Sequence, residues 1–222
     1  MHAFILAAGF GTRLRPLTEK VPKPLIQITS EPLIEYQIRW LRNAGINDIV
    51  INLHHLGSQI EEYLKDGSNL RVNIAYSWED TILETGGGIF QALPLLKSDP
   101  FVVLNGDVWT NYSFKPDSIP SESLAHLVLV PNPKGRSFGD FSLDGPFIRR
   151  PAEPSSRNLT FSGISFLRHK LFKNKKIEPF SLTRELLFDR LDENCITGEI
   201  FNGTWIDIGT PETLKQVRRM ML

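Results

Sequence analysis

The first half of the chain alternates short apolar runs with amphipathic stretches. Runs that are rich in β-branched side chains and bounded by turn residues are typical of buried strands. The runs that predict strands lie at 3–7, 48–53, 71–77 and 101–104.

Helix signals separate these runs. Pro32 and Gly45 bracket an amphipathic stretch, which predicts a helix over 33–44. Ser58 and Glu61 have the spacing of a capping box and predict a second, short helix. Because strands alternate with helices, we predict an α/β fold whose mostly parallel sheet carries helices on both faces.

The pattern changes after about residue 110. Strands are predicted at 124–130, 138–143 and 159–167, joined by links rich in Pro and Gly, and they suggest an added antiparallel or mixed β layer. Helical periodicity returns over 182–191, and a last helix is predicted from Pro211 after Thr210. Since no fixed-period repeat is present, no left-handed β-helix is expected, and 1–222 is read as one domain.

Composition narrows the function classes. The 222 residues include 25 Lys+Arg and 25 Asp+Glu, so no net charge recruits nucleic acid or an anionic membrane. No segment approaches the roughly 20 apolar residues that cross a bilayer, and no secretory signal is recognised. Cys195 is the only cysteine, which excludes an intramolecular disulfide and favours a reducing, cytoplasmic location.

The most informative stretch follows the first predicted strand. It reads LAAGFGTRLRPLT at 6–18, followed by PKPL at 22–25. Small residues let backbone N–H groups approach phosphate oxygens, and Arg13 and Lys23 add positive charge there. A dinucleotide fingerprint would need glycine where Leu14 stands, and a Walker loop would need Gly-Lys-Ser/Thr. A tight turn with solvated cations is the alternative to phosphate binding.

Two carboxylates offer a metal site. Asp107 and Asp207 each follow a short apolar run, and the carboxyl ends of strands in an open α/β sheet are where ligands bind. If both strands end at one sheet edge, their hard oxygen ligands favour Mg²⁺, which also takes water and phosphate oxygens. A turn or capping role for each aspartate is the alternative.

The ordered motifs resemble those of sugar-1-phosphate nucleotidyltransferases. They are the 9–18 and 22–25 segments, Asn105-Gly106-Asp107, and WIDIGTPE at 205–212, and they span nearly the whole chain. The resemblance implies a Rossmann-like fold with a nucleotide-binding half (1–109) and a sugar-phosphate-binding half (110–222). It implies nucleotide contacts from Leu6, Ala8, Gly9, Gly11, Thr12, Arg13, Lys23, Gly86, Gly87 and Asn105.

Further segments are similar to the N-acetylmuramate-1-phosphate uridylyltransferases of peptidoglycan recycling. They are ETGGGIF at 84–90, NGDVWT at 105–110, GDF at 139–141 and TFSGIS at 160–165. The resemblance implies transfer of UMP from UTP to N-acetylmuramate 1-phosphate, without a covalent intermediate. Asp140 matches an acceptor-contacting position, whereas Asn111 departs from an acidic residue of that group and receives no ligand role.

The resemblance also implies the roles at the reaction centre. Arg13 is assigned to the departing pyrophosphate, Lys23 to the reacting phosphates, and Asp107 and Asp207 to Mg²⁺. The glycines at 86–88 are expected to form a loop against the uracil edge. Arg149 and Arg150 stand near a position where hexose enzymes carry Glu-Lys-Pro, and we expect them to suit the carboxylate of a muramyl group.

Alternatives stay open. One is a guanylyl- or uridylyltransferase acting on mannose or glucose 1-phosphate, and another is a module of this fold that senses nucleotide sugars without catalysis. The expected partners are UTP and a sugar 1-phosphate, with neither nucleic acid nor membrane. We expect a monomer, with a dimer as the alternative.

Overall fold

The structure is a computed structural model that describes residues 1–222 except 116–118, 134–135, 137, 152–157 and 222. Its strands are β1 (His2–Leu6), β2 (Asp48–Leu53), β3 (Asn73–Trp78), β4 (Phe101–Asn105), β5 (Val108–Thr110), β6 (Ala125–Pro131), β7 (Ser142–Asp144), β8 (Phe147–Arg149), β9 (Leu159–Leu167), β10 (Ile196–Ile200) and β11 (Trp205–Asp207). Its α-helices are α1 (Leu33–Asn43), α2 (Gly57–Leu64), α3 (Glu84–Ala92) and α4 (Pro211–Met220).

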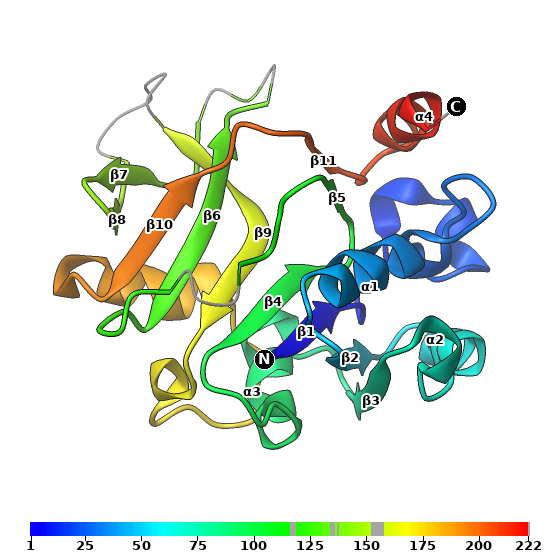
Figure 1. Cartoon of the computed structure of the whole chain (residues 1–222), viewed down its shortest axis with the longest axis horizontal. Coiled ribbons are helices and arrows are strands. Elements are labelled where there is room, and N and C mark those ends of the chain that lie inside the picture. The colour runs from blue at the N-terminus through cyan, green and yellow to red at the C-terminus, as the bar shows by residue number, and fades with distance from the viewer. Residues whose placement is uncertain (116–118, 134–135, 137, 152–157, 222) are drawn as a thin grey trace.

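One large mixed sheet organises these elements (Figure 1). Its strand order is β3-β2-β1-β4-β9-β6-β10-β8-β7, and β5 pairs with β11 in a separate two-stranded sheet. The β3-β2-β1-β4 part is parallel, and β9 runs antiparallel to both β4 and β6. Strands β6 to β10 therefore extend the same sheet, and β5–β11 is a separate small layer.

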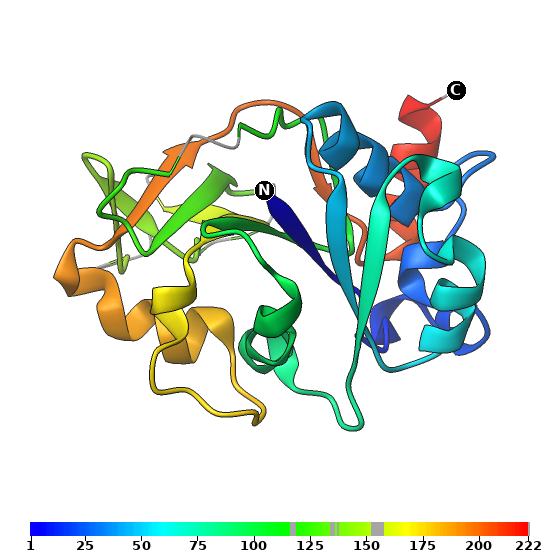
Figure 2. The ribbon, with the colours of Figure 1, turned by 60° about the horizontal axis from the view of Figure 1, so that its bottom comes forward.

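The two faces of the sheet explain where the helices lie. Along β1, Ala3 and Ile5 join the core formed with α1 and α2, whereas Phe4 points the other way and packs with α3 and the 182–191 segment. Alternation along a strand sends successive side chains to opposite faces. Figure 2 shows α1 and α3 on opposite sides of the sheet. The α/β fold with both faces covered is confirmed.

Most predicted elements are found within a residue or two. The apolar runs at 48–53, 101–104 and 159–167 correspond to β2, β4 and β9, and the helix predicted from Pro211 is α4. Thr210 caps α4 by accepting the Thr213 N–H, while the Thr213 hydroxyl accepts the Thr210 N–H. Within the described residues no helix is both long and apolar enough to cross a bilayer.

Two local predictions are wrong. The short helix starts at Gly57 after Leu56, without a side-chain cap, so Ser58 and Glu61 form no capping box. A β-carbon at Gly57 would lie 2.8 Å from the Leu53 side chain, so close packing rather than capping determines this helix start. The helical period predicted over 182–191 is confirmed, and the segment winds as a π-helix at Thr183–Leu187 followed by a 3-10 helix at Phe188–Glu193.

The second correction concerns 138–143. Only Ser142–Asp144 forms a strand there, as β7, and Phe141 makes an isolated antiparallel bridge to Leu159. Gly139 lies so close to the backbone at Leu159 that a β-carbon would overlap it. The segment therefore follows β9 at short range, which an apolar pattern alone does not reveal.

Candidate active site

The loop after β1 is shaped by one glycine and one threonine. Gly11 has φ +62°, the left-handed region, and a β-carbon there would lie 2.9 Å from Thr18 Cγ2. The Thr18 hydroxyl donates to the Gly11 carbonyl at 2.8 Å, which ties the start of the loop to its middle. Thr12–Leu14 then forms a short 3-10 turn that presents Arg13. The glycine motif thus serves loop geometry as well as access for a ligand.

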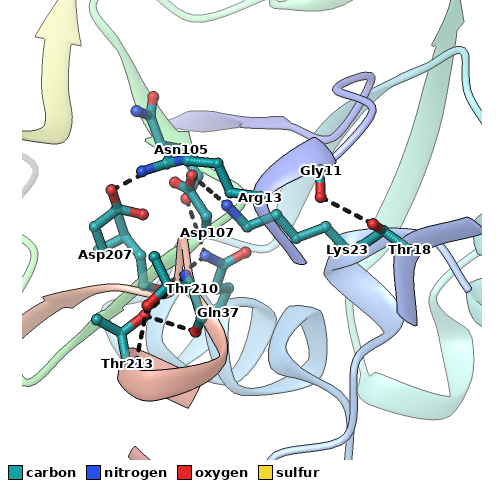
Figure 3. Close-up of polar contacts among 11 residues, drawn as sticks. Gly11, Arg13, Thr18, Lys23, Gln37, Asn105, Asp107, Asp207, Thr210 and Thr213 are labelled. Atoms are coloured by element: carbon teal, nitrogen blue, oxygen red, sulfur yellow. Dashed lines mark hydrogen bonds and ion pairs between the residues drawn. The ribbon is translucent and has the colours of Figure 1, made fainter. Parts of the chain in front are cut away.

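Asp107 stands on the turn between β4 and β5. Lys23 Nζ donates to Asp107 Oδ2 at 2.7 Å, and the Lys23 side chain is only 13% exposed (Figure 3). Gly106 packs its backbone against the Leu6 carbonyl, where a β-carbon would overlap, and its N–H donates to that oxygen at 2.9 Å. The end of β1 therefore fixes the turn that carries the carboxylate.

Asp207 reaches the same place through the β5–β11 ladder. Its Cα pairs with Val108, the neighbour of Asp107, and the Ile208 N–H donates to the Asp107 carbonyl at 2.9 Å. Arg13 lies 3.5 Å from Asp207 Oδ2, and its side chain is 62% exposed, so this is the looser of the two ion pairs. The structure thus brings together two aspartates that are far apart in sequence, each beside a cation (Figure 3).

The electrostatics at Asp207 are unusual for a carboxylate. Burial raises its pKa above the usual range, the nearby Asp107 charge raises it further, and Lys23 and Arg13 oppose the shift. Asp207 Oδ1 is buried and has no hydrogen-bond partner among the described residues. A buried carboxylate oxygen without a hydrogen-bond partner is costly, and a bound water or ion is the usual way in which such an atom is satisfied.

The donor set at this position fits a hard divalent cation. Two carboxylates supply oxygen ligands, and the Oδ1 of Asp207 has no hydrogen-bond partner among the described residues. No group of three or more His, Cys, Asp and Glu side chains within the described part of the chain could hold a metal ion. A cation bound here would therefore need water or substrate oxygens to complete its coordination.

A cavity of about 360 Å³ opens at the carboxyl ends of β1 and β4, within the usual range for small-molecule sites. Most of the predicted nucleotide contacts line it: Leu6, Ala8, Gly9, Gly11, Thr12, Arg13, Lys23 and Asn105, together with Asp107. Its wall also includes Gly209, where a β-carbon would lie 2.7 Å from the Arg13 guanidinium. Gly209 therefore leaves the space that Arg13 occupies.

Gly86 and Gly87 are placed differently from the prediction. They lie inside α3, not in a loop, and both N–H groups donate to the Phe180 carbonyl. β-Carbons at these positions would overlap Phe180 and the Glu178 backbone, so close packing requires the glycines. The neighbouring Glu84 and Thr85 line the cavity instead.

Sequence reasoning missed a buried pair in the cavity wall. Asn52 is the last residue but one of β2, and Glu79 follows β3 directly. Asn52 Nδ2 donates to Glu79 Oε1 at 2.7 Å, and both residues line the cavity. The Ala7 N–H donates to Asn52 Oδ1 at 2.6 Å, and the Leu83 N–H donates to Glu79 Oε2 at 2.9 Å. A β-carbon at Gly88 would lie 2.5 Å from Glu79 Oε1. Polar residues after adjacent parallel strands were the available signal.

Asp140 lies beside β9 rather than on the cavity wall. Its Oδ2 accepts the Phe161 N–H at 2.9 Å, and its Oδ1 pairs with Arg136 at 2.6 Å. The bridge from Phe141 to Leu159 puts this segment beside the first residues of β9. Farther along the same strand, Gly163 packs against the side chain of Asn105, which lines the cavity. Asp140 thus stands on the β9 side of the site.

Arg149 and Arg150 are engaged elsewhere. Arg149 donates to the Leu191 carbonyl at 2.9 Å and to Asn194 Oδ1 at 2.6 Å. The Arg150 guanidinium lies 4.6 Å from the centre of the Phe188 ring. Neither arginine lines the cavity, so their contacts do not favour a role in sugar recognition. Glu153, near these arginines in the sequence, lies outside the described residues.

Asn111, the departure noted in the sequence, has a structural role. Its Oδ1 accepts the Thr204 N–H at 2.7 Å, and its N–H donates to the Thr204 carbonyl at 3.1 Å. These two bonds hold the chain just beyond the β5–β11 ladder. Asn111 does not line the cavity.

The comparisons with known proteins agree on one family. The family model described as nucleotidyl transferase matches residues 2–222. The N-acetylmuramate alpha-1-phosphate uridylyltransferase of Neisseria meningitidis serogroup B is 43% identical over 226 residues, covering 99% of this chain and 98% of the relative. A mannose-1-phosphate guanyltransferase of Saccharomyces cerevisiae is 33% identical, and the match covers 96% of this chain but 62% of the relative.

Solved structures show the same fold. A putative glucose-1-phosphate thymidylyltransferase from Bacillus anthracis has a TM-score of 0.85 at 22% identity, covering 99% of this chain and 95% of the other. HddC from Yersinia pseudotuberculosis, complexed with GMP-PN, has a TM-score of 0.83 at 22% identity, covering 100% and 99%. With its motifs gathered around one cavity, this chain belongs to the nucleotidyl transferase family.

Proposed function

We propose that the protein transfers UMP from UTP to N-acetylmuramate 1-phosphate. A phosphate oxygen of the sugar phosphate attacks the α-phosphorus of UTP, and the bond from that phosphorus to the α,β-bridging oxygen breaks. The products are UDP-N-acetylmuramate and pyrophosphate. The observation that carries the proposal is the near full-length 43% identity with the Neisseria uridylyltransferase, in a chain whose Arg13, Lys23 and Asp107 line one cavity.

The cations suit a reaction between two anions. Lys23 is mostly buried beside Asp107, so it can hold the phosphates at the reaction centre, whereas the exposed Arg13 can follow the departing pyrophosphate. Because a phosphate monoester oxygen is already ionised near neutral pH, the protein needs to align the reactants and offset their repulsion rather than remove a proton. Fixed positive groups at the cavity wall serve both needs.

Asp107 and Asp207 would hold Mg²⁺. When bound, this ion supplies positive charge that neutralises the reacting phosphates and aligns them. The raised pKa of Asp207 and its unpaired Oδ1 support the assignment, because both reflect a carboxylate that lacks a cationic partner close enough to offset its burial.

We assign the base of the nucleotide to the part of the cavity wall that offers hydrogen-bond acceptors. Glu79 is 3% exposed, and its carboxylate accepts hydrogen bonds, as the ring N–H of uracil or guanine would require. Glu84 and Thr85 also line the cavity. Gly86 and Gly87 follow them in α3, where their role is to let the helix backbone pack closely. This acceptor suits UTP and also GTP, so the base alone does not separate the two candidate activities.

We assign the acceptor sugar phosphate to the side of the site that faces β9. Asp140 would accept a hydrogen bond from the acceptor sugar, and its contacts with Arg136 and the Phe161 N–H hold its carboxylate in place. Monomeric state and cytoplasmic location stay predictions from the sequence, and sedimentation and cell fractionation would test them.

The test is release of pyrophosphate over a matrix of substrates. UTP and GTP are each paired with N-acetylmuramate, N-acetylglucosamine and mannose 1-phosphates in the presence of Mg²⁺. We expect UTP with N-acetylmuramate 1-phosphate to have the highest kcat/KM. Preference for GTP with mannose 1-phosphate would instead favour the guanylyltransferase reading, which the yeast relative makes the second candidate. Binding without turnover of any pair would favour a sensing module.

A further inference from the structure

A glutamine is buried in the helix next to the proposed metal site. Gln37 stands in the middle of α1 and is 0% exposed, on the face where Ile34, Ile38 and Leu41 join the apolar core. A primary amide in such a place costs free energy unless it is hydrogen-bonded, so its contacts indicate what it does.

Both contacts of Gln37 go to the turn that carries Asp107. Its Nε2 donates to the Asn105 carbonyl at 3.0 Å and to the Val108 carbonyl at 3.0 Å (Figure 3). A primary amide has two N–H donors, so one side chain uses its whole donor capacity on the residues that flank Gly106 and Asp107. The amide thus clamps the turn on both sides of the carboxylate.

The orientation of this amide is determined by its acceptors. Turning it by 180° would place Oε1 against two carbonyl oxygens, which repel it. In the observed orientation, Gln37 Oε1 is buried and has no hydrogen-bond partner among the described residues. An unpaired buried oxygen lowers stability, so the helix keeps a polar group here at a cost in folding free energy.

The clamp acts on both carboxylates. The Gly106 N–H is bonded to the Leu6 carbonyl, and the Asp107 carbonyl accepts the Ile208 N–H. Val108, whose carbonyl Gln37 binds, is the Cα partner of Asp207 in the β5–β11 ladder. A shift of the turn would therefore change the separation of Asp107 and Asp207.

We infer that Gln37 is a positioning residue that holds Asp107 and, through β5 and β11, Asp207 at the spacing that a shared divalent cation requires. The inference rests on the proposed function, because it assumes that the two carboxylates bind a metal. It predicts that loss of the Gln37 amide weakens the metal site more than it weakens the fold or the binding of the nucleotide itself.

The test compares two glutamine-to-methionine variants. Gln37→Met keeps the length of the side chain and removes both donors. The control Gln91→Met removes the Nε2 contacts from α3 to the Trp78 carbonyl and Ser77 Oγ, away from the turn. Mn²⁺ binding is measured by electron paramagnetic resonance on each folded variant with α,β-imido-UTP, and binding of the analogue without metal is measured by calorimetry.

We expect Gln37→Met to raise the Kd for Mn²⁺ about 10–100-fold, the range seen when residues that orient metal ligands are removed. The Kd of the analogue measured without metal should change less than about twofold, which is well below the change expected in the Kd for Mn²⁺. Gln91→Met should bind Mn²⁺ like the wild type. An unchanged Kd in Gln37→Met, or an equal loss in Gln91→Met, would overturn the inference.

Two further variants separate the outcomes. If Gln37→Met does not fold, Gln37→His takes its place. An imidazole N–H can keep one of the two hydrogen bonds of Gln37 and loses the other. An unchanged Kd for Mn²⁺ in this variant would also overturn the inference. Asp107→Asn should abolish the tight Mn²⁺ site. If the wild type itself binds no Mn²⁺ in the presence of the analogue, the proposed function fails, and this inference fails with it. If the wild type and Gln37→Met both bind Mn²⁺ tightly, only the inference about Gln37 is refuted.

Discussion

At the scale of single residues, Asp207 carries a testable electrostatic cost. Its folded pKa is raised by burial and by Asp107, so ionisation near neutral pH disfavours the folded state. Its contribution to stability is therefore largest at low pH and is lost as the pH rises through that pKa. We therefore compare the free energies of unfolding of the wild type and of Asp207→Asn. As the pH falls from neutral, the wild-type value should rise relative to the value of the variant. Urea unfolding without metal measures this, and a difference that is flat or opposite in sign would contradict it.

Gly11 tests the loop at the same scale. Gly11→Ala combines left-handed strain with a contact 2.9 Å from Thr18 Cγ2, whereas Gly45→Ala has φ +79° and nothing within 4 Å of its β-carbon. Strain alone costs about 1–2 kcal/mol. We expect Gly45→Ala to lose about that much while keeping UTP affinity, and Gly11→Ala to lose more stability and UTP affinity as well. Equal behaviour of the two variants in thermal melts and calorimetry would argue against the role of Gly11.

Residue roles were only partly accessible from the sequence. Arg13, Lys23, Asp107 and Asp207 stand in recognisable motifs, and the fold brings each carboxylate beside a cation. Gln37 stands in no such motif, because its function comes from a turn far along the chain. The available signal was a polar residue on the apolar face of a predicted helix.

At the scale of elements, helix α4 anchors the strand that carries Asp207. Leu214 and Val217 are buried with Ile206 and Ile208, and the Thr210 capping box starts the helix just after Gly209. Thr210→Ala should cost about 1 kcal/mol, because the Thr213 N–H loses its side-chain acceptor. For a chain of this size we expect the Tm to fall by about 2–4 °C, with Thr210→Ser close to wild type. A Tm unchanged in the alanine variant would contradict the capping role.

Elements were predictable where local pattern and tertiary packing agree. The apolar run that forms β9 is found at the predicted residues 159–167. Helix α3 was not predicted from Glu84, because Gly86 and Gly87 weaken a helix in isolation and are needed only for contact with Phe180. The π and 3-10 winding after residue 182 likewise depends on packing that a helical period does not encode.

At the scale of the whole molecule, the two predicted halves share one sheet and the apolar core on one of its faces. β9 pairs with β4, and a single buried cluster contains Phe4 and Phe101 together with Phe141 and Leu187. We therefore expect one cooperative unfolding transition, with tryptophan fluorescence and far-ultraviolet circular dichroism giving the same midpoint in urea. Two separated transitions would show that 1–109 and 110–222 unfold independently.

The central claim is that Asp107 and Asp207 jointly hold a divalent cation beside a triphosphate in this cavity. Anomalous scattering from a crystal of the protein with Mn²⁺ and α,β-imido-UTP tests it most directly. We expect a peak about 2.0–2.3 Å from oxygens of both carboxylates and of the α-phosphate, as for a hard divalent cation close to Mg²⁺ in size. A bound analogue whose metal contacts neither aspartate would contradict it.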